Sequence, residues 1–309
     1  MPSGLHCRIR AAAILTATAL CTGQPAPTIR VDVTVVSVLC SVRDRNGALV
    51  NHLGQDDFIL LEEGKPQAIR RFARETGLPL TVGLLIDTSN SQVRWIDDER
   101  RATAKFFSQV IRAKDTAFLI AFDATTELLM EPATSRRLIA AGLDRLRRNS
   151  PELRRGRTGR PRGTLLYDAV HRASTQELQK GPGRKAIVLI TDGMDVGSSA
   201  RMDDAINAAQ KADTIIYSIY YGGASEAAGP GQFVLEEMSE QTGGRFFRVG
   251  RRSPLKKIFD QIQEEMRSQY ALEFTPPEES KDGGYRRLEV LLRDPKLSAQ
   301  ARKGYYAIK

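Results

Sequence analysis

Leu85-Ile86-Asp87-Thr88-Ser89-Asn90-Ser91 is the stretch that decides the fold. It begins at the end of an apolar run, Val82 to Ile86, and then places three oxygen-bearing side chains at alternate positions. A second apolar run, Ala186 to Ile190, leads in the same way to Asp192. Both runs are predicted to be buried parallel strands. In an open α/β sheet, ligands bind at the carboxyl ends of such strands, so both polar groups are expected at one edge.

A fifth oxygen donor, Thr164, follows Gly163 and is expected to open a helix over residues 164–179. Hydroxyl and carboxylate oxygens without Cys or His suit a hard cation such as Mg²⁺, and Mn²⁺ and Ca²⁺ fit the same donor set. Soft metals are disfavoured by these ligands. An ion held mainly by neutral hydroxyls keeps the capacity to take one more oxygen, for which a carboxylate from outside is the natural ligand.

These motifs together resemble a von Willebrand factor A (VWFA) domain. The pattern Asp-x-Ser-x-Ser, a distant Thr in Arg162-Gly163-Thr164-Leu165, and Thr191-Asp192-Gly193 occur in the family's order. The resemblance covers about residues 76–268 and implies a metal-ion-dependent adhesion site (MIDAS). Its five implied metal ligands are Asp87, Ser89, Ser91, Thr164 and Asp192. Asn90 stands where many members have Gly, and Arg162 replaces the first residue of a common Gly pair.

The pattern between these motifs predicts a Rossmann-like, doubly wound α/β domain. Apolar runs and helical periodicity alternate regularly along it. The expected strands are 81–86, 117–122, 126–130, 185–190, 214–220 and 245–249, and the expected helices are 92–111, 135–147, 164–179, 201–212, 231–241 and 254–268. In the family, the last helix can move when ligand binds, and residues 254–268 lead directly into the Tyr270 strand.

The two ends of the chain read as β structure. Residues 28–75 alternate in hydropathy and contain two turn signals, Asn46-Gly47 and Glu63-Gly64. Residues 269–309 also read as strands, and both ends resemble exported bacterial VWFA proteins of the kind best known from Acidobacteria. The two segments are expected to form one small β-sandwich, with the VWFA domain of residues 76–268 inserted in it.

The first 23 residues resemble a secretory signal peptide. Arg8 and Arg10 precede an apolar run too short to span a membrane, with small residues that allow cleavage after Ala19 or Gly23. The expected location is the periplasm, the cell surface or the medium, and no transmembrane segment is expected in the mature chain. Cys40 would then be the one cysteine left, and its place in an alternating strand favours a buried, inert thiol.

Basic charge is concentrated before Thr164. Residues 136–162 contain ten arginines against Asp144 and Glu152, a net charge of +8 in 27 residues. One interpretation is a solvated loop that serves solubility, and the other is a rim that attracts anionic partners. The rim residues would be Arg154, Arg155, Arg157, Arg160 and Arg162. The run contains no Phe, Tyr or Trp on which bases could stack, which together with the export signal argues against nucleic acid.

Catalysis is not expected. His52 lies in the β leader, and His171 falls about 10 Å below Thr164 along its helix. Asp168 could support the metal ligands or be a carboxylate on the helix surface. Asp195 could tune the metal, but its position favours a turn residue. No nucleophile elbow, Walker loop or dinucleotide fingerprint follows a strand. The sequence predicts a non-enzymatic adhesion or complex-assembly module whose Mg²⁺ is completed by an Asp or Glu of a protein partner. The alternative is a metal-independent scaffold that binds anionic partners through loop 149–163. The oligomeric state is left open.

Overall fold

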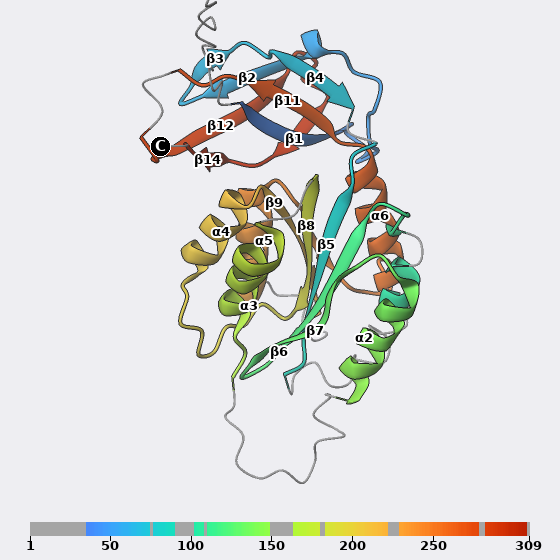
Figure 1. Ribbon diagram of the computed structural model, residues 1–309. Coiled ribbons are helices and arrows are strands. Elements are labelled where there is room, and N and C mark those ends of the chain that lie inside the picture. Colours follow the sequence, from blue (N-terminus) through green and yellow to red (C-terminus); the bar gives the residue numbers. More distant parts are fainter. Residues whose placement is uncertain are drawn as a thin grey trace, which may run out of the picture. The chain divides into compact units, whose positions relative to one another are not determined.

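The computed structural model describes residues 35–74, 77–89, 102–107, 110–148, 163–179, 183–221, 229–277 and 282–307. Its central element is a six-stranded sheet with the strand order β10-β9-β8-β5-β6-β7 (Figure 1). The strands are β5 (Leu80–Asp87), β6 (Thr116–Phe122), β7 (Thr126–Ala133), β8 (Arg184–Thr191), β9 (Thr214–Tyr220) and β10 (Phe246–Arg248). All neighbours run parallel except β6 and β7, which are antiparallel.

The middle of this sheet is buried on both faces. Every residue of β5 is buried, and it has β8 on one side and β6 on the other. A continuous apolar run such as Val82 to Ile86 suits this position because helices cover both faces of a parallel sheet. The two polar runs that follow β5 and β8 therefore leave the sheet at the same edge.

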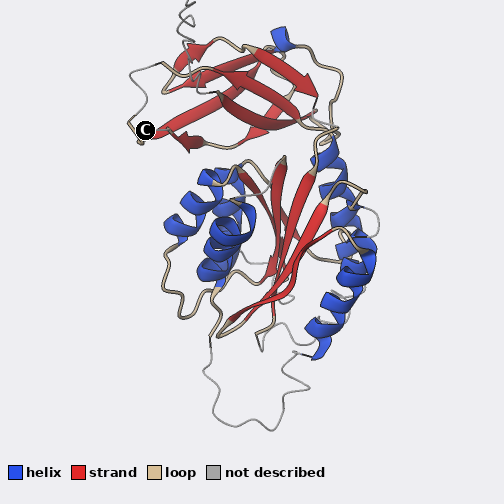
Figure 2. Cartoon of the chain, viewed as in Figure 1, coloured by secondary structure: helices blue, strands red, loops and turns tan. Residues whose placement is uncertain are grey.

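Helices cover the sheet on both sides (Figures 1 and 2). They are α2 (Arg136–Arg148), α3 (Leu166–Arg172), α4 (Met202–Lys211), α5 (Pro230–Thr242) and α6 (Leu255–Arg267). One apolar cluster joins α2 and α6 to the sheet through Ile139 and Ile258, and another joins α3, α4 and α5 through Val170, Ala209 and Leu235. This layered arrangement confirms the predicted doubly wound α/β fold.

Strands from the two ends of the chain form two further sheets, of order β13-β1-β11-β4 and β14-β12-β2-β3. The early strands are β1 (Val36–Arg43), β2 (Phe58–Glu62), β3 (Lys65–Gln67) and β4 (Arg71–Arg74); the late ones are β11 (Tyr270–Phe274), β12 (Tyr285–Leu292), β13 (Ser298–Ala301) and β14 (Gly304–Tyr306). Each sheet pairs early strands with late ones, for example β1 with β11 and β2 with β12. The predicted sandwich is therefore present.

One apolar cluster, which includes Val38, Phe58, Leu272 and Tyr305, fills the space between these two sheets. Cys40 lies in this cluster as a free thiol. Burial raises the pKa of Cys40 to about 12, so the thiol stays protonated and unreactive, as the alternating pattern predicted.

Both predicted turns are present, and one helix boundary was wrong. Glu63 and Gly64 form the turn between β2 and β3. Asn46-Gly47 also lies in a turn, which the antiparallel bridge from Arg43 to Leu49 closes, although no strand follows it directly. The helix expected over residues 164–179 begins only at Leu166 and continues as a π-helical segment over Ala173–Leu178.

Some predictions lie outside the described residues. They are the signal peptide of residues 1–23, the metal ligand Ser91, the arginines of loop 149–162, and the first part of helix 92–111, which the structure describes from residue 102. Among the described residues, no helix is both long and apolar enough to cross a membrane.

Candidate metal site

Asp87 is the last residue of β5 and is completely buried. Both of its carboxylate oxygens accept hydrogen bonds from the protein. The Thr191 hydroxyl donates to Oδ2 at 2.6 Å, and the Ser89 backbone N–H donates to Oδ1 at 2.8 Å. These two bonds come from neighbouring strand ends, so they fix the carboxylate plane at the edge of the sheet where β5 and β8 finish.

No basic side chain in the described part of the chain balances the charge of Asp87. Among the described residues, Asp87 takes part in no ion pair. Burial raises the pKa of Asp87 to about 6, and the nearby Asp192 carboxylate adds to the rise, while the hydrogen bonds from Thr191 and Ser89 oppose it. The protein thus holds a buried carboxylate beside a second one, an arrangement that a cation would stabilise.

Asp192 follows β8 and begins a tight loop. Its Oδ1 accepts the backbone N–H of Met194 at 3.2 Å. Gly193 has φ +75°, and a Cβ there would meet the Gly231 carbonyl oxygen at 2.1 Å. A Cβ on Gly231 would meet the Asp192 carbonyl oxygen at the same distance of 2.1 Å. The first turn of α5 therefore presses directly on the Asp192 loop, which explains why Thr191-Asp192 is followed by glycine.

Thr164 is buried and reaches the site through a loop rather than through a helix. Thr164 and Val196 exchange two backbone hydrogen bonds, of 3.0 and 2.9 Å, in an isolated antiparallel bridge. The N–H of the next residue, Leu165, donates to the Asp123 carbonyl oxygen after β6 at 2.8 Å. Thr164 is thereby tied to the loops after both β6 and β8, at the edge that carries Asp87 and Asp192.

Asp168 and Asp195 hold the loop after Asp192 in place. The Asp168 carboxylate accepts the backbone N–H groups of Ser199 and Ala200, at 3.0 and 2.8 Å. Asp195 accepts the Ser198 hydroxyl at 2.6 Å and the Tyr167 N–H at 3.2 Å. Asp195 is therefore a turn residue, as the sequence suggested. Asp168 holds the backbone of the loop by accepting its N–H groups. His52 and His171 are exposed.

The structure brings Asp87, Ser89 and Asp192 together and ties Thr164 to the loop after Asp192, while Ser91 lies outside the described residues. Sequence reasoning missed Thr191, although it stands inside the quoted motif: a hydroxyl one residue before Asp192 is in position to reach the neighbouring strand end. The donors are carboxylates and hydroxyls, and they fit a hard divalent cation. The described residues contain no group of three or more His, Cys, Asp or Glu that could hold a metal ion.

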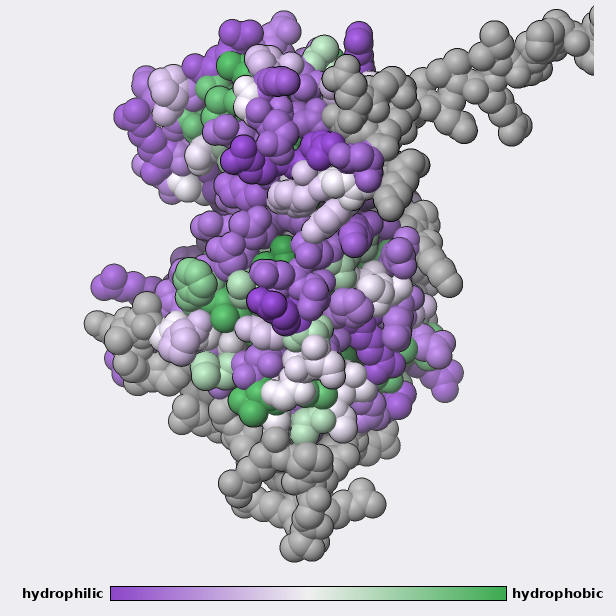
Figure 3. Space-filling model, turned by 90° about the vertical axis from the view of Figure 1, so that its left-hand side faces the viewer, coloured by the Kyte–Doolittle hydropathy of each residue, from purple (hydrophilic) through white to green (hydrophobic). Residues whose placement is uncertain are grey.

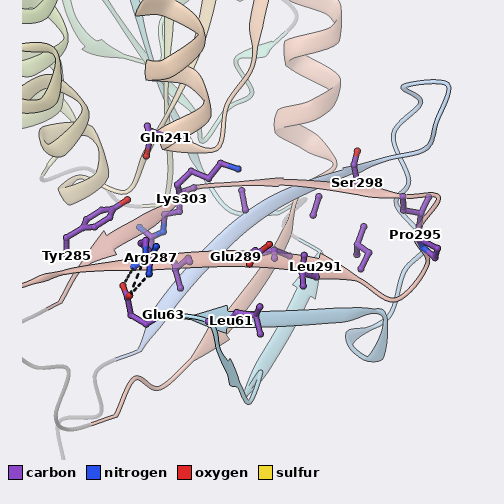
Figure 4. A pocket seen from close by; sticks show the side chains of 18 residues that line it. Leu61, Glu63, Gln241, Tyr285, Arg287, Glu289, Leu291, Pro295, Ser298 and Lys303 are labelled. Carbon is purple, nitrogen blue, oxygen red and sulfur yellow. Dashed lines mark hydrogen bonds and ion pairs between the residues drawn. The ribbon is translucent and has the colours of Figure 1, made fainter.

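A large groove lies elsewhere, along β12 of the sandwich (Figure 4). It encloses about 990 Å³. β12 pairs with β2 over Leu288–Leu292 but with β14 only over Tyr285–Arg287, so the rest of this strand edge is open. The Glu63–Arg287 ion pair lies at its rim, at 3.3 Å. The described residues that line the groove include neither His nor Cys.

No protein-family model matches the chain, and no curated protein sequence does. Among solved structures, the chain is similar to the conserved hypothetical protein BatB from Bacteroides thetaiotaomicron, with 18% identity and a TM-score of 0.46 over 62% of this chain and 100% of BatB. It is also similar to the vWF domain of the type V pili tip protein Mfa5 from Porphyromonas gingivalis, with 12% identity and a TM-score of 0.46 over 61% of this chain and 95% of that domain.

A further similar structure is proximal thread matrix protein 1 from the mussel byssus, in a form with a zinc-occupied MIDAS motif. Its identity is 13% and its TM-score 0.45, over 63% of this chain and 50% of that chain. Identities below 20% with TM-scores below 0.5 carry no information about the metal or the function of the present chain. The fold of this protein follows from its own strand order.

Proposed function

We propose that this chain is an exported, non-enzymatic binding module that holds Mg²⁺ at Asp87, Ser89, Ser91, Thr164 and Asp192 and completes the ion's coordination with an acidic residue of a protein partner. The observation that carries the proposal is Asp87: a completely buried carboxylate, oriented by two hydrogen bonds, beside a second carboxylate and with no basic partner among the described residues. The order of the VWFA motifs supports the same assignment.

In this proposal the protein supplies the binding geometry and the ion supplies Lewis acidity toward an incoming oxygen. Thr191 and Ser89 hold the Asp87 carboxylate in one orientation. The contact between Gly193 and Gly231 holds the Asp192 loop, and the bridge to Val196 holds Thr164. Such preorganisation lowers the cost of binding because the donors need not be ordered when the ion arrives.

Titration of the full chain with Mn²⁺, followed by water-proton relaxation, tests the metal site. Wild type is expected to show one saturable site that Mg²⁺ displaces, and Asp192→Ala should weaken it at least 100-fold while the circular dichroism spectrum stays unchanged. Asp123→Asn removes a carboxylate at the same edge of the sheet that is engaged with Thr125, and it should bind Mn²⁺ like wild type. Equal binding by Asp192→Ala and wild type would refute the assignment.

The metal-independent alternative makes the opposite prediction. Binding of poly-L-glutamate through the arginines of loop 149–163 would survive EDTA and be lost in 0.5 M NaCl, because exposed charges are screened by salt. A Mg²⁺-dependent acidic ligand would instead be released by EDTA. Measuring release of the same labelled polymer under both conditions decides between the two functions.

A further inference from the structure

Two exposed apolar side chains stand beside the proposed metal ligands. Met194 and Val196 are 46% and 54% exposed, although both lie within four residues of Asp192. Directly opposed residues of an antiparallel pair place their side chains on the same face, so the Val196 side chain lies next to that of Thr164. Met194 is bound through its N–H to the Asp192 carboxylate. We call Met194 and Val196 the apolar rim.

The apolar rim is held rigidly. Asp168 and Asp195 fix the loop that follows it through hydrogen bonds to Ser199, Ala200 and Ser198. On the other side, a Cβ on Gly163 would meet the Val196 carbonyl oxygen at 2.8 Å, so the two loops touch with no space for a side chain between them. Apolar side chains exposed on an anchored loop keep a fixed surface, which reduces the ordering cost of a contact with them.

The loop that carries the apolar rim has little charge of its own. Asp195 is the one ionisable residue between Gly193 and Ala200, and its oxygens are turned toward Ser198 and Tyr167 within the protein. On the side of the molecule drawn in Figure 3, hydrophobic side chains form small areas separated by hydrophilic ones. Met194 and Val196 thus place an apolar surface beside the charged metal ligands. Such a surface favours an uncharged residue next to the bound acid of the partner.

We propose that the acidic residue captured by the metal site is flanked in the partner by an aliphatic residue, which packs on Met194 and Val196. This inference rests on the proposed function, because it names what lies beside the metal-bound carboxylate. The metal and its ligands select the acid, and the apolar rim selects the residue next to it. Partners whose acid lies in a highly charged or polar segment would bind more weakly.

The probes are three peptides, Gly-Leu-Asp-Leu-Gly, Gly-Ser-Asp-Ser-Gly and Gly-Leu-Asn-Leu-Gly, each titrated into the Mg²⁺-loaded full chain and followed by NMR. The Leu-Asp-Leu peptide should bind about tenfold more tightly than Ser-Asp-Ser, since part of an aliphatic side chain leaves water. The Asn peptide should not bind. In the double variant Met194→Ser, Val196→Ser the preference should fall below twofold, whereas Mn²⁺ binding should stay as in wild type.

Leu138→Ser is the matched control. Leu138 is 52% exposed on α2, which packs on the opposite face of the sheet from α3, and the tenfold preference should persist there. Equal affinity of wild type for the two Asp peptides would overturn the rim proposal and leave the metal site intact. Binding of no Asp peptide, or binding that EDTA does not abolish, would refute the proposed function and the rim with it.

Discussion

Asp87 and Glu265 are both completely buried carboxylates, and their surroundings differ sharply. Glu265, near the end of α6, accepts hydrogen bonds from the guanidinium groups of Arg43 and Arg245 and from the Ser41 hydroxyl. Asp87, at the end of β5, accepts a hydroxyl and a backbone N–H and has a second carboxylate nearby. Both are polar groups in an apolar interior, but of the two only Glu265 forms ion pairs with described residues.

This difference separates a structural carboxylate from one that is available to a ligand. A buried charge is costly unless it is paired and hydrogen-bonded. Glu265 meets both conditions within the protein and ties β1 of the sandwich to α6 and to the residue before β10. Within the described residues Asp87 meets only the second condition, which is why we propose that an external cation pairs with it. The comparison can be tested by removing each group in turn.

The largest effect is expected from Glu265→Ala. The change leaves Arg43 and Arg245, whose side chains are 17% and 30% exposed, without their shared carboxylate. Breaking a buried pair by removing one partner costs about 4 kcal/mol of unfolding free energy. Urea unfolding measures this loss, which should be the same with Mg²⁺ and with EDTA.

Glu264→Ala is the control for that measurement, because the neighbouring Glu264 is exposed and the change should alter the unfolding free energy by less than about 0.5 kcal/mol. If Glu265→Ala lowered the unfolding free energy no more than this control, water would solvate the two arginines well enough to replace Glu265. Glu265 would then contribute no more to stability than a surface carboxylate.

A smaller effect, which depends on pH, is expected at Asp87. Its pKa in the folded, metal-free protein is about 6, against a usual value of 3.8. The folded state binds the Asp87 proton more tightly than the unfolded state does. This contribution to the free energy of unfolding is therefore complete below pH 3.8, the usual pKa, and is lost as the pH rises through about 6. The loss amounts to about 3 kcal/mol by linkage.

The measurement is the unfolding free energy in EDTA from pH 4 to pH 7, for wild type and Asp87→Asn. As the pH rises, the unfolding free energy of wild type should fall relative to that of Asp87→Asn. With saturating Mg²⁺ the wild type should recover at pH 7, because the ion binds the deprotonated carboxylate. A difference that does not change with pH would mean that Asp87 has a basic partner.

The sequence predicted the fold well because the features that determine it are local and strong. Buried parallel strands are uninterrupted apolar runs, and Thr214–Tyr220 was predicted to the residue. The start of α3 was misplaced because Thr164 pairs with Val196, a contact between distant loops that no local pattern reports. Asn46-Gly47 marks a turn that is present, but a turn signal cannot show whether both flanking segments remain in a sheet, and here only one bridge, Arg43 to Leu49, follows it.

The same reasoning explains what was missed in the candidate site. Carboxylates and hydroxyls in motif order can be read from the sequence, so Asp87 and Asp192 were found. Thr191 was missed because it bonds Asp87, 104 residues away, and its role depends on which strand ends are neighbours. The contacts by which Asp168 and Asp195 hold the loop depend in the same way on α3 lying beside that loop. Glu265 escaped notice because its helix reads as an ordinary amphipathic helix until Arg43 and Arg245 are brought to it.

The smallest predicted effect concerns Thr191, which orients Asp87 and in turn accepts the Gly193 N–H at 3.1 Å. Thr191→Val keeps the shape and removes the hydroxyl, so the Asp87 carboxylate is free to rotate. Metal affinity should fall about tenfold, the lower end of the range for groups that orient a ligand. Thr88→Val is the control, because Thr88 is also buried and adjacent to Asp87 but donates to the Phe122 carbonyl oxygen. If both variants lost Mn²⁺ affinity equally, loss of packing would explain the change; a loss confined to Thr191→Val, with recovery in Thr191→Ser, would show that the hydroxyl positions Asp87 for the ion.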